Sequence, residues 1–243
     1  MIKILKKLKY HYEVLFNDEI YNIETLVIYK YQIKDGSEFS LEQFNKILKD
    51  NEFYYFDRFA KKKLSKLLTI KELNDILLKE GAGDSIVQEL VTNYISLNYL
   101  NDDYYVKSYL DFKGSKEGKQ LIKKQLMRKG ISEELIDNHL KLVNEDEKIT
   151  NLISLRINKY PNLNKQQLTN KLISFLTNKG FDYYLVKNIV NLKLASITID
   201  ESKLIEKDYQ KLVKRYSEDI NKIKQKLYNK GYNLTLIEKI INK

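Results

Sequence analysis

Residues 126–136 read LMRKGISEELI, and three other stretches of the chain repeat their pattern. Each copy is centred on a glycine, and the glycines Gly81, Gly130, Gly180 and Gly231 are 49, 50 and 51 residues apart. Apolar residues stand eight and four places before each glycine, and five, six and ten places after it. This is the spacing of one buried face on each of two helices, so the sequence predicts four helix–glycine–helix units.

The glycine junction itself has the features of a helix end followed by a helix start. Glycine adopts the left-handed backbone conformation that ends a helix without a Cβ clash. A lysine precedes it in three copies, where a cation complements the negative end of the helix dipole. Two places after the glycine a capping residue begins the next helix, and Gly83 takes that place in the first copy. The lysines are Lys129, Lys179 and Lys230, and the other caps are Ser132, Asp182 and Asn233.

A third helix is expected between successive pairs, over residues 102–113, 145–159 and 200–216. Pro161 follows the second of these helices, where its missing N–H and fixed ring end a helix. The body is therefore predicted to be mainly α-helical, a tandem array of three-helix repeats with an elongated, curved form. We divide it into repeats at residues 69–113, 114–160 and 161–216, and a truncated terminal repeat at 217–243.

The N-terminal segment, residues 1–68, has a different pattern. Tyr10, Tyr12, Val14 and Phe16 alternate along the chain before a polar turn, which predicts a β-hairpin within residues 1–25. The basic and apolar residues that open the chain are expected to form a first strand leading into this hairpin. The alternative for them is a helix on a membrane surface.

Helices are expected in the rest of this segment. A short one is predicted over residues 26–32, before the break at 35–36. Ser40 and Gln43 have the spacing of a capping box, so a helix is predicted to begin there. A longer helix is predicted over residues 52–68.

Composition argues against several classes of function. The chain has no cysteine, which excludes disulfides and thiol chemistry and fits a reducing cytoplasm. It has no apolar run near the roughly 18 residues that a membrane span needs. The two histidines, His11 and His139, are far apart, and a half-buried structural role is expected for His139. No glycine-rich phosphate loop is present, and residues 145–147 fit a solvated helix start. We therefore predict a protein that is not an enzyme, with no catalytic residue, cofactor or metal.

The net charge of +10 favours anionic partners, nucleic acid above all. The alternative is a bias toward lysine codons, since nearly all the basic residues are lysine. Residues 104–130 hold eight Lys and Arg against two acids, a balance of +6. On a helical wheel the cations of residues 116–128 lie away from the apolar arc, on a face suited to a phosphate backbone or an acidic protein groove. A merely solvated face is the competing interpretation. The predicted contact residues are Lys107, Lys113, Lys116, Lys119, Lys123, Lys124 and Arg128.

The 19 tyrosines raise the possibility of base stacking. Tyr94, Tyr99 and Tyr105 lie among apolar neighbours in the sequence, so we expect most tyrosines to pack against the protein instead.

Three motifs carry a family resemblance: NYLNDDY at 98–104, GSKEGK at 114–119 and LMRKGI at 126–131. In this order and repeat context they resemble the RecX family of regulators of the RecA recombinase, over residues 60–243. Where the family has a Gly-Pro turn, this chain has Gly118-Lys119. Where the family has a lysine just before that turn, this chain has Glu117. Lys116 is expected to take over the role of that lysine.

The resemblance implies a curved helical modulator that lies in the groove of the RecA–single-stranded DNA filament and limits strand exchange. It implies RecA and DNA, single-stranded and possibly double-stranded, as partners. We expect a cytoplasmic monomer that does not bind membranes. Two alternatives stay open: a sequence-specific DNA-binding transcriptional regulator, in which two helices around a glycine turn form a helix-turn-helix, and a generic helical scaffold for protein interactions.

Overall fold

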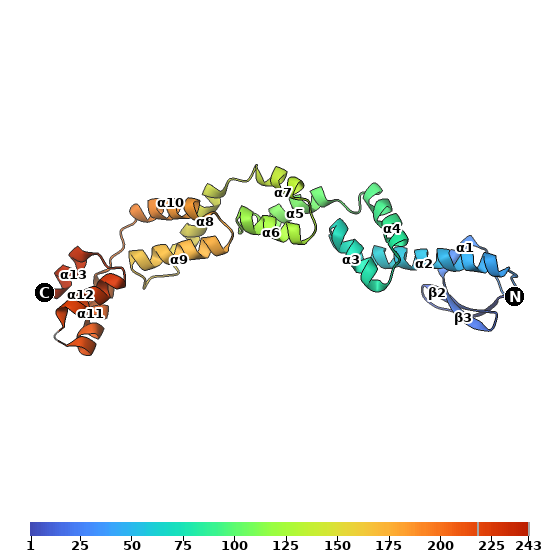
Figure 1. Ribbon diagram of the computed structural model, residues 1–243, viewed down its shortest axis with the longest axis horizontal. Coiled ribbons are helices and arrows are strands. Elements are labelled where there is room, and N and C mark those ends of the chain that lie inside the picture. Colours follow the sequence, from blue (N-terminus) through green and yellow to red (C-terminus); the bar gives the residue numbers. More distant parts are fainter. Residues whose placement is uncertain (218, 243) are drawn as a thin grey trace. The chain divides into compact units, whose positions relative to one another are not determined.

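The computed structural model describes residues 1–217 and 219–242, and its helices and strands are drawn in Figure 1. It divides into two compact units. The first unit holds residues 1–105 and 129–131, and the second holds residues 106–128 and the chain from residue 132 onward. Residues 218 and 243 of the expected terminal segment 217–243 lie outside the described residues.

A three-stranded antiparallel sheet opens the first unit, with β1 (Lys3–Lys7), β2 (His11–Phe16) and β3 (Glu19–Glu24) in that order. The β2–β3 turn is tight because Asn17 and Asp18 both take positive φ angles, 48° and 63°, as a two-residue hairpin turn requires. The expected first strand and hairpin are thus confirmed.

Two helices complete the N-terminal core: α1 (Thr25–Lys30) and α2 (Leu41–Lys63). Ser40 and Gln43 form the expected capping box at the start of α2. The ring of Phe44 on this helix stacks on Phe16 of the sheet, with 3.9 Å between centroids. The prediction of a separate helix over residues 52–68 was wrong: α2 runs unbroken through residue 52, because its buried face continues from Phe44 and Ile47 to Phe56 and Ala60.

The first glycine pair follows, as α3 (Ile70–Glu80) and α4 (Asp84–Ser96). These helices pack together and against the end of α2, around Leu73, Leu77 and Tyr94. The buried hydroxyl of Tyr94 donates a 2.6 Å hydrogen bond to Asp57. Tyr99 packs only in part. Its ring makes an edge contact with Tyr94, with 6.2 Å between centroids, but the residue is 66% exposed.

The remaining helices confirm the predicted pattern of pairs and third helices. Helix α5 spans Asp102–Lys113, which is its predicted range. In the second unit each pair packs on itself, and Ser132, Asp182 and Asn233 cap the helices that they precede. These helices are α6 (Lys119–Arg128), α7 (Glu133–Leu140), α8 (Glu145–Ile157), α9 (Lys165–Asn178), α10 (Tyr183–Ala195), α11 (Ser202–Tyr216), α12 (Ile220–Asn229) and α13 (Leu234–Ile241).

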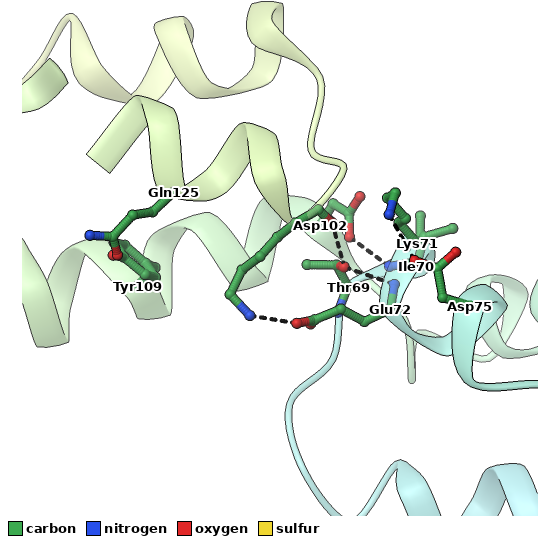
Figure 2. Close-up of polar contacts among 9 residues, drawn as sticks. Thr69, Ile70, Lys71, Glu72, Asp75, Asp102, Tyr109 and Gln125 are labelled. Carbon is green, nitrogen blue, oxygen red and sulfur yellow. Dashed lines mark hydrogen bonds and ion pairs between the residues drawn. The ribbon is translucent and has the colours of Figure 1, made fainter. Parts of the chain in front are cut away.

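One hydrogen bond recurs between successive repeats, from the start of a repeat's first helix to the glycine junction of the next repeat. The acceptor is always the main-chain carbonyl of the lysine before the glycine. In the first case the hydroxyl of Thr69, which Figure 2 labels, donates to Lys129 over 2.7 Å. The other donors are the Gly118 amide to Lys179 and the Asn164 Nδ2 to Lys230, each at 2.8 Å.

A second hydrogen bond recurs within each full repeat. The first amide of the first helix donates to a carboxylate that opens the third helix, as Ile70 does to Asp102 over 3.0 Å (Figure 2). Lys119 donates in the same way to Glu145 over 2.8 Å, and Lys165 to Glu201 over 2.5 Å. The sequence context suggested only that Glu145 is a solvated residue at a helix start, and the structure gives it a further role. It satisfies an amide that a helix start leaves without an intrahelical partner.

The junction glycines have two structural roles, and only one of them was predicted. All four take positive φ angles, between 83° and 101°. At Gly180 a Cβ atom would also lie 2.4 Å from the backbone nitrogen of Leu121 in the preceding repeat, whereas at Gly81 it would meet nothing within 4 Å. Gly180 therefore permits close approach of two backbones as well as the turn.

Candidate interaction surface

The predicted contact residues lie on α5, on α6 and on the turn between them, all within the second unit. Helix α6 buries Ile122 and Leu126, and this fixes which of its side chains face outward. Exposed cations are found at Lys107 on α5, Lys116 in the turn, and Lys124 and Arg128 on α6. Lys113, Lys119 and Lys123 are half-buried.

Lys123 is held by two carboxylates of α7. Its ammonium lies 2.6 Å from Glu133 and 2.8 Å from Asp137. Hydrogen bonds to Asp137 and then Glu133 raise the pKa of Lys123 above its ordinary value. Its charge is balanced within the protein, so Lys123 is a weaker candidate for contact with an external anion than its exposed neighbours.

Glu117 ties the turn before α6 to α5. Only 8% of this residue is exposed, and its carboxylate accepts a hydrogen bond from Tyr109. Tyr109 also contacts Gln125 of α6. Lys113 lies 3.8 Å from the same carboxylate. Lys116, in contrast, is exposed, so the turn presents Lys116 to solvent and uses Glu117 internally.

Lys148 of α8 adds a cation that the sequence reasoning did not include. Burial lowers its pKa, the charge of Glu145 opposes this shift, and the charge of Lys119 adds to it. Lys119 and Lys148 are thus electrostatic neighbours. Because Lys148 is 29 places after Lys119 in the chain, a helical wheel of α6 cannot reveal it.

Within the described part of the chain, Lys116, Lys124 and Arg128 are exposed and form no ion pair. Lys129, which the sequence count of cations included, turns inward in the first unit. Its ammonium lies 2.5 Å from Glu72 and 5.2 Å from the ring centroid of Tyr105. The strongest candidates for binding an external anion are therefore Lys116, Lys124 and Arg128.

Other kinds of site find little support among residues 1–217 and 219–242. No cluster of three or more histidine, aspartate or glutamate residues there could hold a metal ion. His139 is half-buried, as expected. In the same residues, no helix is both long and apolar enough to cross a lipid bilayer.

Comparisons with known proteins give one consistent result. No protein-family model matches the chain. A protein named regulatory protein RecX from Streptococcus uberis is 32% identical over 98% of this chain and 96% of its own length. A protein of the same name from Clostridium perfringens is 30% identical over 68% of this chain and 80% of its own length.

Solved structures agree with these relatives. A crystal structure of regulatory protein RecX superposes with a TM-score of 0.60 at 20% identity, covering 79% of this chain and 97% of that one. RecX from Lactobacillus salivarius gives a TM-score of 0.55 at 27% identity, covering 61% and 99%. The first of these likenesses concerns the fold alone.

Proposed function

The chain belongs to the RecX family of regulatory proteins, and from this premise we propose that it modulates a RecA recombinase. The proposed target is the RecA filament on single-stranded DNA, in the cytoplasm, and the proposed effect is to limit ATP turnover and strand exchange. The protein acts in this proposal by binding, as a monomer, and carries out no catalysis.

The observation that carries the proposal is the exposure of Lys116, Lys124 and Arg128, which form no ion pair among the described residues. Contacts with phosphates release counterions and supply sequence-independent affinity, which suits a partner that covers DNA of any sequence. A transcriptional regulator would instead need one privileged recognition helix, and the repeats here share their apolar stripes and junction bonds.

We expect charge reversal of the unpaired cations to weaken regulation. In the variant Lys116→Glu, Lys124→Glu, Arg128→Glu, the concentration that half-inhibits the single-stranded-DNA-dependent ATPase of RecA should rise about tenfold or more. Far-UV circular dichroism should be unchanged because all three side chains are exposed.

The matched control reverses three exposed lysines elsewhere, Lys46, Lys79 and Lys171, and should change the inhibitory concentration less than threefold, about 0.6 kcal/mol. Equal effects of the two triple variants would contradict the assignment of this surface. Failure of the unmodified protein to change the ATPase activity or filament length would contradict the function itself.

A further inference from the structure

Helix α11 carries a row of four lysines that are not among the contact residues predicted from the sequence. Lys203, Lys207, Lys211 and Lys214 follow one another at spacings of four, four and three residues. At about 100° per residue they fall within about 80° of one another on the helix, over a length of about 16 Å. All four are exposed. We call these four residues the lysine ladder.

The packing of α11 keeps the side chains of the lysine ladder on the solvent side of the helix. The opposite side of α11 buries Ile205 and packs Leu212 and Val213 against a core shared with α12 and α13. Because the helix is fixed on that side, the lysines cannot turn inward without the loss of this core. The charged side chains are thus presented by a helix that is packed against a core.

The acids of α11 are engaged elsewhere. Asp208 accepts a hydrogen bond from the hydroxyl of Tyr232 over 3.0 Å and lies 2.8 Å from the ammonium of Lys230. Glu206 accepts a hydrogen bond from Gln210 over 3.0 Å. In the part of the chain that the structure describes, no ladder lysine forms an ion pair, in contrast to Lys123.

The exposed face of α11 also lacks apolar anchors. Its exposed residues are polar throughout: Ser202, the four ladder lysines, Gln210 and Arg215. Protein interfaces take most of their binding energy from buried aromatic and apolar side chains together with arginine. A row of lysines without exposed aromatic or apolar neighbours on the same helix fits a partner recognised mainly through charge. Successive lysines rise by about 4.5 to 6 Å along the helix.

We propose that the lysine ladder of α11 binds the phosphate backbone of single-stranded nucleic acid, as a second contact surface separate from α6. The inference rests on the proposed function in one respect, since the strand would be the one that RecA covers. It adds a second basic segment to the one at residues 104–130. Residues 202–230 hold nine Lys and Arg against four acids, a balance of +5, close to the +6 of residues 104–130.

The test is direct binding to a dye-labelled oligothymidine strand, followed by fluorescence anisotropy across a range of NaCl concentrations and without RecA. The variant Lys203→Gln, Lys207→Gln, Lys211→Gln, Lys214→Gln removes the ladder. Each phosphate contact with a single strand contributes about 0.7 to the slope of log K against log salt, so four contacts contribute about 2.8. We expect the slope to fall by about 2 to 3 and the affinity at low salt to fall at least tenfold.

The matched control neutralises four exposed lysines that do not form a row: Lys46, Lys79, Lys159 and Lys171. Its slope should change by less than about 1, because these residues make no aligned contacts. Equal changes in slope for the two variants would overturn the proposal, and so would equal displacement of the strand by polyglutamate. Circular dichroism should confirm that both variants are folded.

The RecA assay separates this proposal from the proposed function. Inhibition of the RecA ATPase together with an unchanged slope in the ladder variant would refute the ladder and leave the function standing. A reduced slope in a protein that never affects RecA would support the ladder and refute the function.

Discussion

The junction glycines show how much can depend on a missing side chain. Gly180 has a φ of 83°, and the backbone of Leu121 stands where its Cβ would be. Gly81 has a φ of 101° and open space at the same position. The sequence predicted the left-handed turn at both positions from their register. It could not predict the close approach, because Leu121 is 59 residues away from Gly180 and belongs to another repeat.

This difference gives a prediction for two alanine variants. Gly81→Ala should cost only the strain of a left-handed residue, about 1–2 kcal/mol. Gly180→Ala should cost a further 1–3 kcal/mol or so, because the neighbouring backbone must move. Urea unfolding followed by circular dichroism measures both. A cost for Gly180→Ala no larger than that for Gly81→Ala would mean that the two repeats separate freely at this junction.

The surroundings of single charged residues were predicted less well than the conformation of the junction glycines. The helical wheel correctly predicted the exposure of Lys116, Lys124 and Arg128. It could not predict that Lys123 is held by Glu133 and Asp137, since these acids lie on the next helix. The lysine ladder on α11 is present in the sequence as spacings of four, four and three, but its lack of ion pairs among the described residues required the structure.

At the scale of elements, the start of each first helix performs two tasks. Asn164 shows them best: its Oδ1 accepts from the amide of Gln167 as a helix cap, and its Nδ2 donates to Lys230 of the next repeat. The cap could have been predicted from Asn164 and Gln167 alone. The donation could not, because nothing local indicates a partner 66 residues away.

Replacement of this amide by a carboxylate separates the two tasks. Asn164→Asp keeps the capping acceptor, which is equally good in an isolated helix, and loses the donor toward Lys230. We expect it to lower the free energy of unfolding by about 1–3 kcal/mol, since the partly buried carbonyl of Lys230 loses its donor and faces a charge. The control is Asn233→Asp, an exposed cap that bonds Leu236 of its own helix, where the change should stay within about 0.5 kcal/mol. Equal costs at the two positions would show that the bond to Lys230 contributes nothing.

At the scale of the whole molecule, the stability of each repeat depends on its contacts with the repeats next to it in the chain. The described hydrogen bonds between repeats join each repeat to the next one, as between Gly118 and Lys179 and between Asn164 and Lys230. In such an architecture the free energy is close to a sum of terms for each repeat and each interface. The order of helices was predicted from the sequence because it depends on a periodic pattern, whereas the family resemblance rested on the motifs at residues 98–104, 114–119 and 126–131. The interfaces were not predicted, because they depend on how repeats pack.

A local defect should therefore remain local. In the Asn164→Asp variant, hydrogen–deuterium exchange measured by mass spectrometry should become faster in residues 220–241 and at the start of α9. Exchange in α3 and α4 should match that of the unmodified protein. A uniform increase over the whole chain would indicate a single cooperative unit instead of a series of coupled repeats.

The junction bonds have an evolutionary consequence, because each of them is accepted by a main-chain carbonyl. Three different donors occupy the partner position: a hydroxyl, an amide of the backbone and a side-chain amide. Residue identity on the accepting side is thus unconstrained by the bond itself. Duplicated repeats can then diverge in surface charge while they continue to stack, and a gene can redistribute its contacts with a partner among copies without rebuilding the scaffold.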